Sequence, residues 1–439
     1  MINRLIKSIS IALLLVFFLT ARGYGQVNAN DSLELVPLIN KVIQTYPTFQ
    51  QAIEALNAAD IKIALARSAY LPNAFVSGSF AHIGPVPSLT LPDVGSFTLA
   101  PKDNIDAGLK VNQQISDFGK TKKNIEFEEK SKELSSLGIG QVKQKMSVAV
   151  IGCYYNLLYF QEAMAIKDEQ LLTLAAHLKN VEKKTETGSA TQYEILSTQV
   201  RISNVESQKT DVVTSLNFQN SYLNMLLGEP ATAKHRVRNL LHSDLIPFAE
   251  DSLIAVALNN RNEVKISEKK IMLSQAYQDL LKKHENPVLS AFASGGWKNG
   301  YIPELAKPKA NYAVGLSLLI PIFDANRNDL NTKLAGSAIH TYSLEADQTR
   351  RTVTNEVMES INALKAAISK TELFSMQLSQ AKKALELADL RFKSGTLTNL
   401  DLLDAENAVS ESSLLLLKAR IERVVIAYKL KAALGINLY

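Results

Sequence analysis

The hydrophobic and polar positions along this chain follow two distinct periods. Over most of the sequence, apolar residues recur every three or four positions, as in Leu171, Leu174 and Leu178, which is the spacing of an amphipathic helix. This pattern predicts helices over residues 32–69, 119–187, 191–227, 252–284, 325–394 and 398–434. The two longest have about 70 residues each and would extend on the order of 100 Å. Such lengths favour a rod or tube of packed helices, with a lone coiled coil as the simpler alternative.

Two shorter stretches follow a period of two, which is that of a β-strand. Apolar or small residues occupy alternate positions from Ile105 to Val111 and from Ala310 to Leu318. One apolar face and one wet face over about ten residues is typical of a transmembrane strand, although a half-buried hairpin of a soluble protein has the same pattern. We therefore predict two strands within 72–115 and two within 287–320, each pair joined by an exposed, proline-containing loop.

Four strands are too few to close a barrel in a membrane. The smallest membrane barrels have about eight strands, and hydrocarbon does not tolerate an unpaired sheet edge. If these strands cross a membrane, the chain must oligomerise. Two copies and three copies both satisfy this argument.

The chain carries the same landmarks twice. Gly188-Ser-Ala-Thr191 is followed by Gly228, 40 residues after Gly188, and Gly395-Thr-Leu-Thr398 is followed by Gly435 at the same spacing. A glycine can adopt the left-handed conformation that ends a helix, and Thr191 and Thr398 can cap the helices that follow. These four residues are therefore predicted to form two equivalent helix turns.

The division of the chain follows from these landmarks. The long helices are preceded by Asp117-Phe118-Gly119 in one copy and by Phe323-Asp324-Ala325 in the other. We predict a first structural repeat over 26–228, a linker over 229–251 and a second repeat over 252–439. Each repeat has the order helix, two strands, long helix, helix.

The N-terminus has the composition of a secretory signal peptide over residues 1–25. Arg4 and Lys7 precede an apolar run that is too short for a comfortable membrane span, and small residues follow it. Removing these residues takes away three basic side chains and lowers the formal net charge from +5 to +2, so the basic balance gives no support to a nucleic-acid partner.

Candidate chemistry is sparse. The one cysteine, Cys153, stands on an apolar helical stretch and is expected to be a small buried residue. The six histidines are scattered without metal-ligand spacing, and no nucleophile or phosphate-binding motif has a suitable context. We therefore expect no catalytic site, no metal site and no cofactor, and a function in passage rather than catalysis.

The order and spacing of several segments resemble the TolC family of outer-membrane efflux proteins over essentially the whole mature sequence. The segments that carry the resemblance are Tyr70-Leu71-Pro72, Asn260-Arg261-Asn262-Glu263, Leu319-Ile320-Pro321-Ile322-Phe323-Asp324 and Arg391-Phe392-Lys393-Ser394-Gly395-Thr396-Leu397-Thr398. The resemblance implies a mixed α/β membrane protein in which a homotrimer shares one 12-stranded transmembrane β-barrel in outer-membrane lipid, continued into the periplasm by an α-helical barrel. It also implies a periplasmic adaptor protein and an inner-membrane transporter, such as an RND or ABC pump, as partners. The turns with Gly188, Thr191, Gly395 and Thr398 would be the tips that meet the adaptor.

The resemblance also indicates a pore gate. Acidic residues six and nine positions after the second turn glycine surround the constriction in the family, and Asp401 and Asp404 fill those positions here. In a trimer they would form two rings of carboxylates that attract cations. Glu194 is the corresponding residue of the first copy. The family has a basic latch residue two positions after that glycine, but Leu397 stands there, so the latch is in doubt unless Arg391 or Lys393 replaces it.

Two functions are compatible with these features. The first is an outer-membrane exit duct of a tripartite efflux or type I secretion system. The alternative is a periplasmic coiled-coil scaffold or adaptor without a pore, although no sequence for the lipoyl and β-barrel domains of an adaptor is evident. The sequence does not identify the substrate, the pump or the adaptor.

Overall fold

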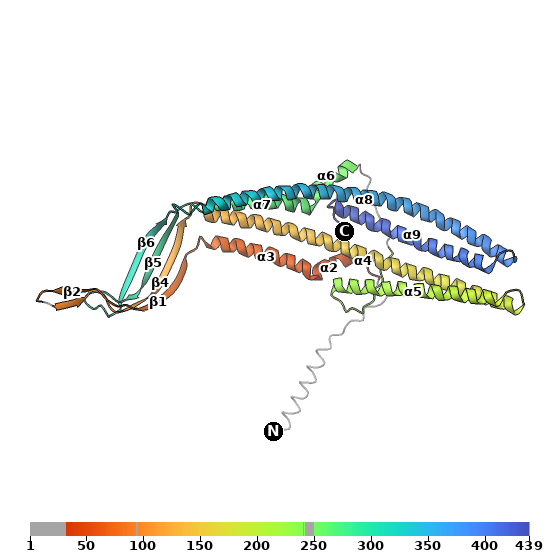
Figure 1. Cartoon of the computed structure of the whole chain (residues 1–439), viewed down its shortest axis with the longest axis horizontal. Helices are drawn as coiled ribbons and strands as arrows, with labels where there is room; N and C mark the ends of the chain where they lie inside the picture. The colour runs from red at the N-terminus through yellow and green to blue at the C-terminus, as the bar shows by residue number, and fades with distance from the viewer. Residues whose placement is uncertain (1–31, 94, 240, 242–249, 439) are drawn as a thin grey trace, which may run out of the picture. The chain divides into compact units, whose positions relative to one another are not determined.

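The computed structural model describes residues 32–93, 95–239, 241 and 250–438, and the predicted signal peptide lies outside them. The first half of the chain contains α2 (Leu35–Thr45), α3 (Pro47–Ser68), β1 (Asn73–His82), β2 (Ser88–Leu91), β3 (Gly95–Thr98), β4 (Asp103–Ser116), α4 (Lys120–Glu186) and α5 (Gln192–Leu227) (Figure 1). The second half contains α6 (Glu250–Asn260), α7 (Asn262–Lys282), β5 (Val288–Lys298), β6 (Lys309–Leu319), α8 (Arg327–Lys393) and α9 (Asn399–Ala433). Internal contacts divide the chain into two units. The first comprises 1–38, 152–241 and 374–421, and the second comprises 39–151, 242–373 and 422–439.

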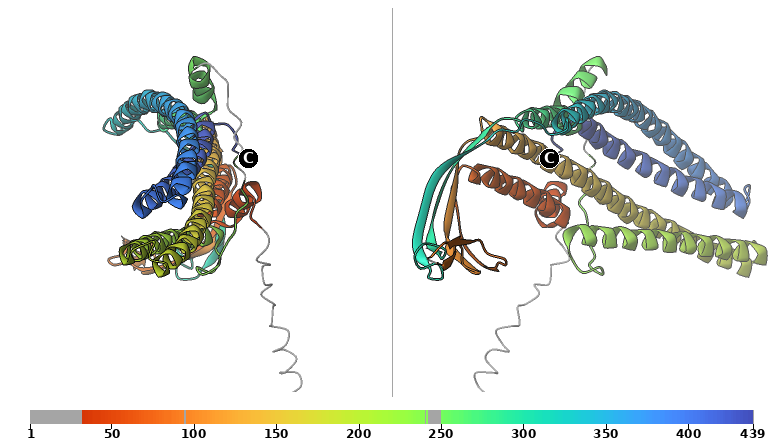
Figure 2. Two further views of the ribbon diagram at one scale, coloured as in Figure 1. Left: turned by 90° about the vertical axis from the view of Figure 1, so that its right-hand side faces the viewer. Right: turned by 60° about the vertical axis from the view of Figure 1, so that its left-hand side comes forward.

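The second unit contains an antiparallel sheet with the order β1-β4-β5-β6. Its two halves come from distant parts of the sequence and meet where β4 pairs with β5. The sheet is visibly curved (Figure 2). Strands β1 and β6 are its edges and have no further partner among the described residues.

The strand register gives the sheet two different faces. Val76 pairs with Leu109, and the rows that continue from this pair across β5 and β6 place the apolar side chains of all four strands on one face. That face carries Val76, Phe80, Ile105, Leu109, Val111, Trp297, Tyr312, Val314, Leu316 and Leu318. The other face carries mainly serine, asparagine, glycine and charged residues. Tyr312 and Val314 are 86% and 76% exposed, so the described residues leave this part of the apolar face uncovered.

The centre of the sheet depends on glycine. Gly108 of β4 lies opposite Gly296 of β5, and a Cβ atom on Gly296 would collide with the carbonyl oxygen of Ala107. Any larger residue would force the two strands apart, because the obstacle is backbone rather than a flexible side chain. The absence of side chains therefore allows the close approach that joins the two halves of the sheet.

The connection between β1 and β4 differs from the prediction of two strands within 72–115. It folds into a further hairpin, in which Leu89 of β2 pairs with Phe97 of β3 (Figure 2). Both Asp93, with φ of 64°, and Gly95, with φ of 102°, adopt left-handed conformations at its turn. The alternation of Leu-Thr-Leu and Ser-Phe-Thr favours strands there, and the prolines lie outside both strands, either flanking the hairpin or, as Pro92, in its turn.

Two predicted helices are each divided in two. The helix expected over 32–69 breaks at Tyr46, which is extended, and Pro47 begins the next helix, because a proline cannot donate to the preceding turn. The helix expected over 252–284 breaks at Arg261. Buried Arg261 pairs with Glu263 at 2.9 Å and with Glu356 of α8 at 2.7 Å, so its side chain connects the break to the neighbouring helix. The breaks depend on Pro47 and on the ion pairs of Arg261, and the spacing of apolar residues does not indicate either.

The long helices start in the same way in both halves of the chain. The Asp117 carboxylate accepts a hydrogen bond from the Thr121 amide at 2.6 Å, and the Asp324 carboxylate accepts one from the Asn328 amide at 2.8 Å. Two residues with positive φ follow each aspartate. The matching segments are therefore Asp117-Phe118-Gly119 and Asp324-Ala325-Asn326, one residue later in the second copy than the pattern of phenylalanines indicated.

Each unit has its own apolar core. In the second unit, buried residues of α6, α7, α8 and α9 pack together in one group, which consists of Leu253, Ala257, Val264, Val353, Val357, Ile361, Leu364, Ala427, Leu430, Ala433 and Leu434. In the first unit, Leu174, Val205 and Leu403 connect α4, α5 and α9. Within the described part of the chain, no helix is both long and apolar enough to span a bilayer.

Candidate functional site

The two glycine turns have the same backbone geometry. Gly188 and Gly395 have φ of 75° and 74°, and both are exposed. The Ser189 amide donates to the Lys184 carbonyl at 2.7 Å, and the Thr396 amide donates to the Arg391 carbonyl at 2.9 Å. Such bonds satisfy the last carbonyl groups of a helix and turn the chain sharply. A Cβ atom at either glycine would meet no neighbour within 4 Å, so the space around both positions is open. The positive φ, and not a lack of space, is therefore what favours glycine there.

Each turn leads into a helix start that carries an acidic residue. Thr398 caps α9, because its hydroxyl accepts from the Asp401 amide at 3.2 Å and donates to the Asp401 carboxylate at 2.6 Å. At the start of α5, the Thr191 amide donates to the Glu194 carboxylate at 3.3 Å. Glu194 and Asp401 therefore occupy equivalent places in the two copies, where an acid also interacts favourably with the helix dipole.

Asp404 has a different environment from Asp401. It accepts a hydrogen bond from Arg201 of α5 at 2.5 Å, and this ion pair connects α5 to α9. Leu397 stands where the TolC family has a basic residue and is partly buried, and Lys393 pairs with Asp389 of its own helix at 2.6 Å rather than with Glu194. A basic residue therefore contacts Asp404, but it is Arg201 of α5 and not a residue of the turn.

Asn399 makes the densest set of polar contacts between these helices. It is only 3% exposed, and its side-chain oxygen lies 2.6 Å from Nε2 of buried His177 on α4. Its amide nitrogen lies 3.3 Å from the hydroxyls of Ser197 and Thr198 and 3.4 Å from the Glu194 carbonyl, all on α5. One residue at the first turn of α9 thus holds α4 and α5 together with α9.

The residues around Asn399 and His177 also contact α8. The His177 ring lies 5.3 Å from the ring of Phe392, and the ammonium group of Lys184 lies 4.0 Å above the centre of that same ring. All four long helices of the first unit therefore meet close to the turns. A sequence reading could not find Arg201, His177 or Asn399, because each stands on an ordinary helical face and its partner is distant in the chain.

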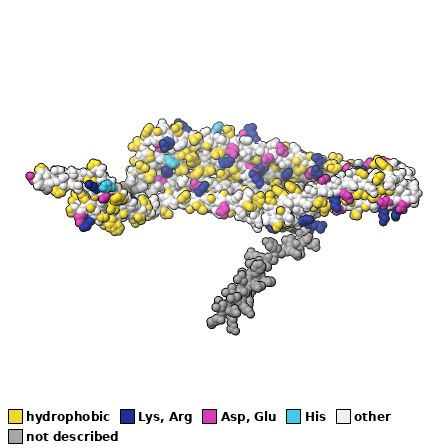
Figure 3. Space-filling view, turned by 60° about the horizontal axis from the view of Figure 1, so that its bottom comes forward, with side chains coloured by type: hydrophobic (Ala, Val, Ile, Leu, Met, Phe, Trp, Pro, Cys, Tyr) yellow, Lys and Arg dark blue, Asp and Glu magenta, His cyan; other side chains and the backbone are white. Residues whose placement is uncertain are grey.

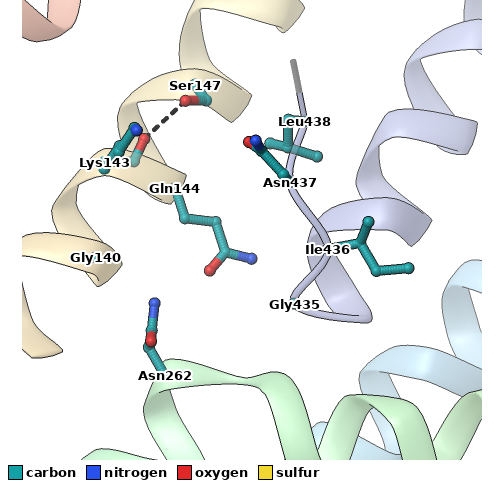
Figure 4. A pocket seen from close by; sticks show the side chains of 9 residues that line it. All are labelled: Gly140, Lys143, Gln144, Ser147, Asn262, Gly435, Ile436, Asn437 and Leu438. Atoms are coloured by element: carbon teal, nitrogen blue, oxygen red, sulfur yellow. Dashed lines mark hydrogen bonds between the residues drawn. The ribbon is translucent and has the colours of Figure 1, made fainter.

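The described residues contain no cluster of histidine, cysteine and acidic side chains that could hold a metal ion. A cavity of about 240 Å³ in the second unit lies between α4, Asn262 and the segment Gly435–Leu438 (Figure 4). The Gln144 amide reaches across it and donates to the Ala432 carbonyl at 2.5 Å, so this polar lining serves to hold the end of the chain.

Comparison with known proteins gives the family. Residues 38–229 and 253–436 match the outer membrane efflux protein family. The chain belongs to that family. It is 19% identical to outer membrane protein TolC of Vibrio cholerae over 91% of this chain and 90% of the relative, and 21% identical to the alkaline protease secretion protein AprF of Pseudomonas aeruginosa over 90% and 82%.

A structural comparison leads to the same fold. The transmembrane channel protein CusC superimposes with a TM-score of 0.77 at 18% identity, covering 92% of this chain and 93% of that one. The expected combination of a membrane sheet and a helical barrel is thereby confirmed as the fold class of this outer membrane efflux protein. It is an outer-membrane exit duct for efflux or secretion, and members of its family are channels that work with pumps.

Proposed function

We propose that three copies of this outer membrane efflux protein close a twelve-stranded barrel in outer-membrane lipid. The two-faced sheet supports this proposal, because among the described residues its apolar face is largely uncovered and its edge strands β1 and β6 have no partner. Unpaired backbone groups at a sheet edge are too costly in hydrocarbon, and β1 of one copy can form the missing backbone hydrogen bonds with β6 of the next copy. A count of three follows the resemblance to the TolC family.

Two matched arginine substitutions on β6 test the assembly. Leu316→Arg places a charge on the apolar face and is expected to cost roughly 2–4 kcal/mol near the bilayer midplane. Ser317→Arg, one position later on the opposite face, is the control and should assemble like the wild type. The readout is the yield of trimer in detergent extracts of outer membranes. Equal yields of the two variants would contradict the proposed orientation of the strands.

We also propose that Asp401, Asp404 and Glu194 line the periplasmic constriction. The ion pair between Arg201 and Asp404 partly neutralises Asp404 inside each chain. The uncompensated negative charge of the constriction would then come mainly from Asp401 and Glu194. Arg201→Ala should therefore increase the preference for cations in planar bilayers, because it leaves Asp404 unpaired. An unchanged preference would argue that Asp404 lies away from the ion path.

The turns around Gly188 and Gly395 are proposed as the tips that meet a periplasmic adaptor, itself joined to an RND or ABC pump of the inner membrane. Their exposure and open surroundings support this role, since a docking surface must present backbone and small side chains without obstruction. Thr191 and Thr398 complete the tips by starting the helices that follow.

A further inference from the structure

The first unit contains a cavity of about 180 Å³ between α4, α8 and α9. Three apolar side chains, Ile166, Leu385 and Val409, form part of its wall. The remaining lining is polar or charged and consists of Glu169, Gln170, Thr173, Lys382, Glu406, Ser410 and Ser413. An apolar cavity of about 150 Å³ holds a molecule the size of benzene, so this one has room for a small organic ligand.

Glu406 has a carboxylate oxygen that is buried and has no hydrogen-bond partner. The hydroxyls around it are already committed elsewhere. Ser410 donates to Gln170 at 2.7 Å, Ser413 donates to its own helix at Val409, and Thr173 donates to its own helix at Glu169. A buried carboxylate oxygen without a donor is costly, so the cavity has an unmet need for a hydrogen-bond donor.

The charges around Glu406 indicate what that donor should carry. Glu169 lies in the same lining, and Asp389 of α8 is close enough to act on Glu406 electrostatically. The cation of the lining is Lys382, which is exposed to solvent. Burial, and then the charge of Asp389, raise the pKa of Glu406 to about 7. A positively charged ligand would lower the free-energy cost of keeping the Glu406 carboxylate ionised in the cavity, whereas an anion would increase that cost.

We propose that this cavity binds a small organic ammonium ion, with its nitrogen donating to Glu406 and its hydrocarbon chain against Ile166, Leu385 and Val409. The site is distinct from the acidic positions near the turns, because Asp401, Asp404 and Glu194 are not part of the cavity lining. Ligand and proton compete for the same carboxylate. Binding should therefore weaken as the pH falls through the pKa of Glu406.

The test uses the purified full-length protein in detergent, with n-butylammonium as the probe and n-butanol as its uncharged match, measured by saturation-transfer NMR and calorimetry. At about pH 8 we expect saturable binding of butylammonium below about 10 mM and none of butanol. Glu406→Gln keeps the shape of the side chain and should weaken binding at least tenfold. Lys382→Met should bind at least as tightly as the wild type. At about pH 5.5 the wild type should lose most of its affinity.

Three results would overturn the proposal. Equal affinity in Glu406→Gln and in the wild type would exclude the carboxylate as the binding group. Absence of saturable binding in both the wild type and Lys382→Met would exclude the cavity as a site. Binding by Lys382→Met alone would show that the lysine side chain itself is the natural occupant.

Discussion

Replacing Asn399 with leucine should loosen the first turns of α9 from α4 and α5. Leucine has the same number of side-chain heavy atoms, is no smaller and has a higher helix propensity, so neither a cavity nor a weaker helix would explain a loss of stability. The change removes the 2.6 Å contact to His177 and three longer contacts to α5. Because Asn399 and His177 are 3% and 6% exposed, water does not replace the lost partner of the ring nitrogen.

The expected magnitude follows from these contacts. A buried polar group left without its partner costs about 1–3 kcal/mol. The three contacts of 3.3–3.4 Å are near the limit of hydrogen bonding and together should add about 1 kcal/mol. We therefore expect the opening of this segment to become easier by about 2–4 kcal/mol, which corresponds to roughly 30- to 1,000-fold faster amide exchange.

Hydrogen-exchange mass spectrometry of the detergent-solubilised protein measures this opening directly. Asn407→Leu is the matched control on the same helix. Its amide donates to Glu411 one turn away, and its contact with Gln170 is 3.4 Å long, so exchange there should change little. The reasoning would be refuted if Asn399→Leu accelerated exchange at the start of α9 no more than Asn407→Leu does.

Three further outcomes follow from the structure. Asp401→Ala combined with Asp404→Ala should reduce the cation preference of the channel in planar bilayers and abolish its block by multivalent cations from the periplasmic side. Trimer yield should not change, and block as strong as in the wild type would refute this role. Gly188→Val combined with Gly395→Val should impair efflux while outer-membrane insertion persists, because each valine must adopt a positive φ at a cost of about 1–2 kcal/mol. Unchanged efflux would contradict the docking role of the turns. Gly296→Val should prevent the close approach of β4 and β5 and lower the amount of folded protein in the outer membrane, and a wild-type amount would contradict the observed packing.

The resemblance carried more information than the local patterns did. The fold class, the outer-membrane location and the role as an exit duct were all predicted from landmark order and spacing, and the comparisons confirm them. The division into two repeats stays a prediction, because the linker over 229–251 is only partly described. The roles of Asp401, Asp404 and Glu194 in a gate, and of the glycine turns in docking, also stay predictions.

The sequence by itself determined those features that depend on neighbouring residues. The long helices, the positive-φ glycines at 188 and 395 and the cap at Thr398 are local features, and the structure has them close to where the pattern placed them. Only the tertiary structure decided which distant residues meet. Arg201 reaches Asp404 across 203 positions and His177 reaches Asn399 across 222, and no spacing rule connects such pairs. The buried carboxylate of Glu406 belongs to the same class, because burial is a property of the packed helices and not of the sequence around one residue.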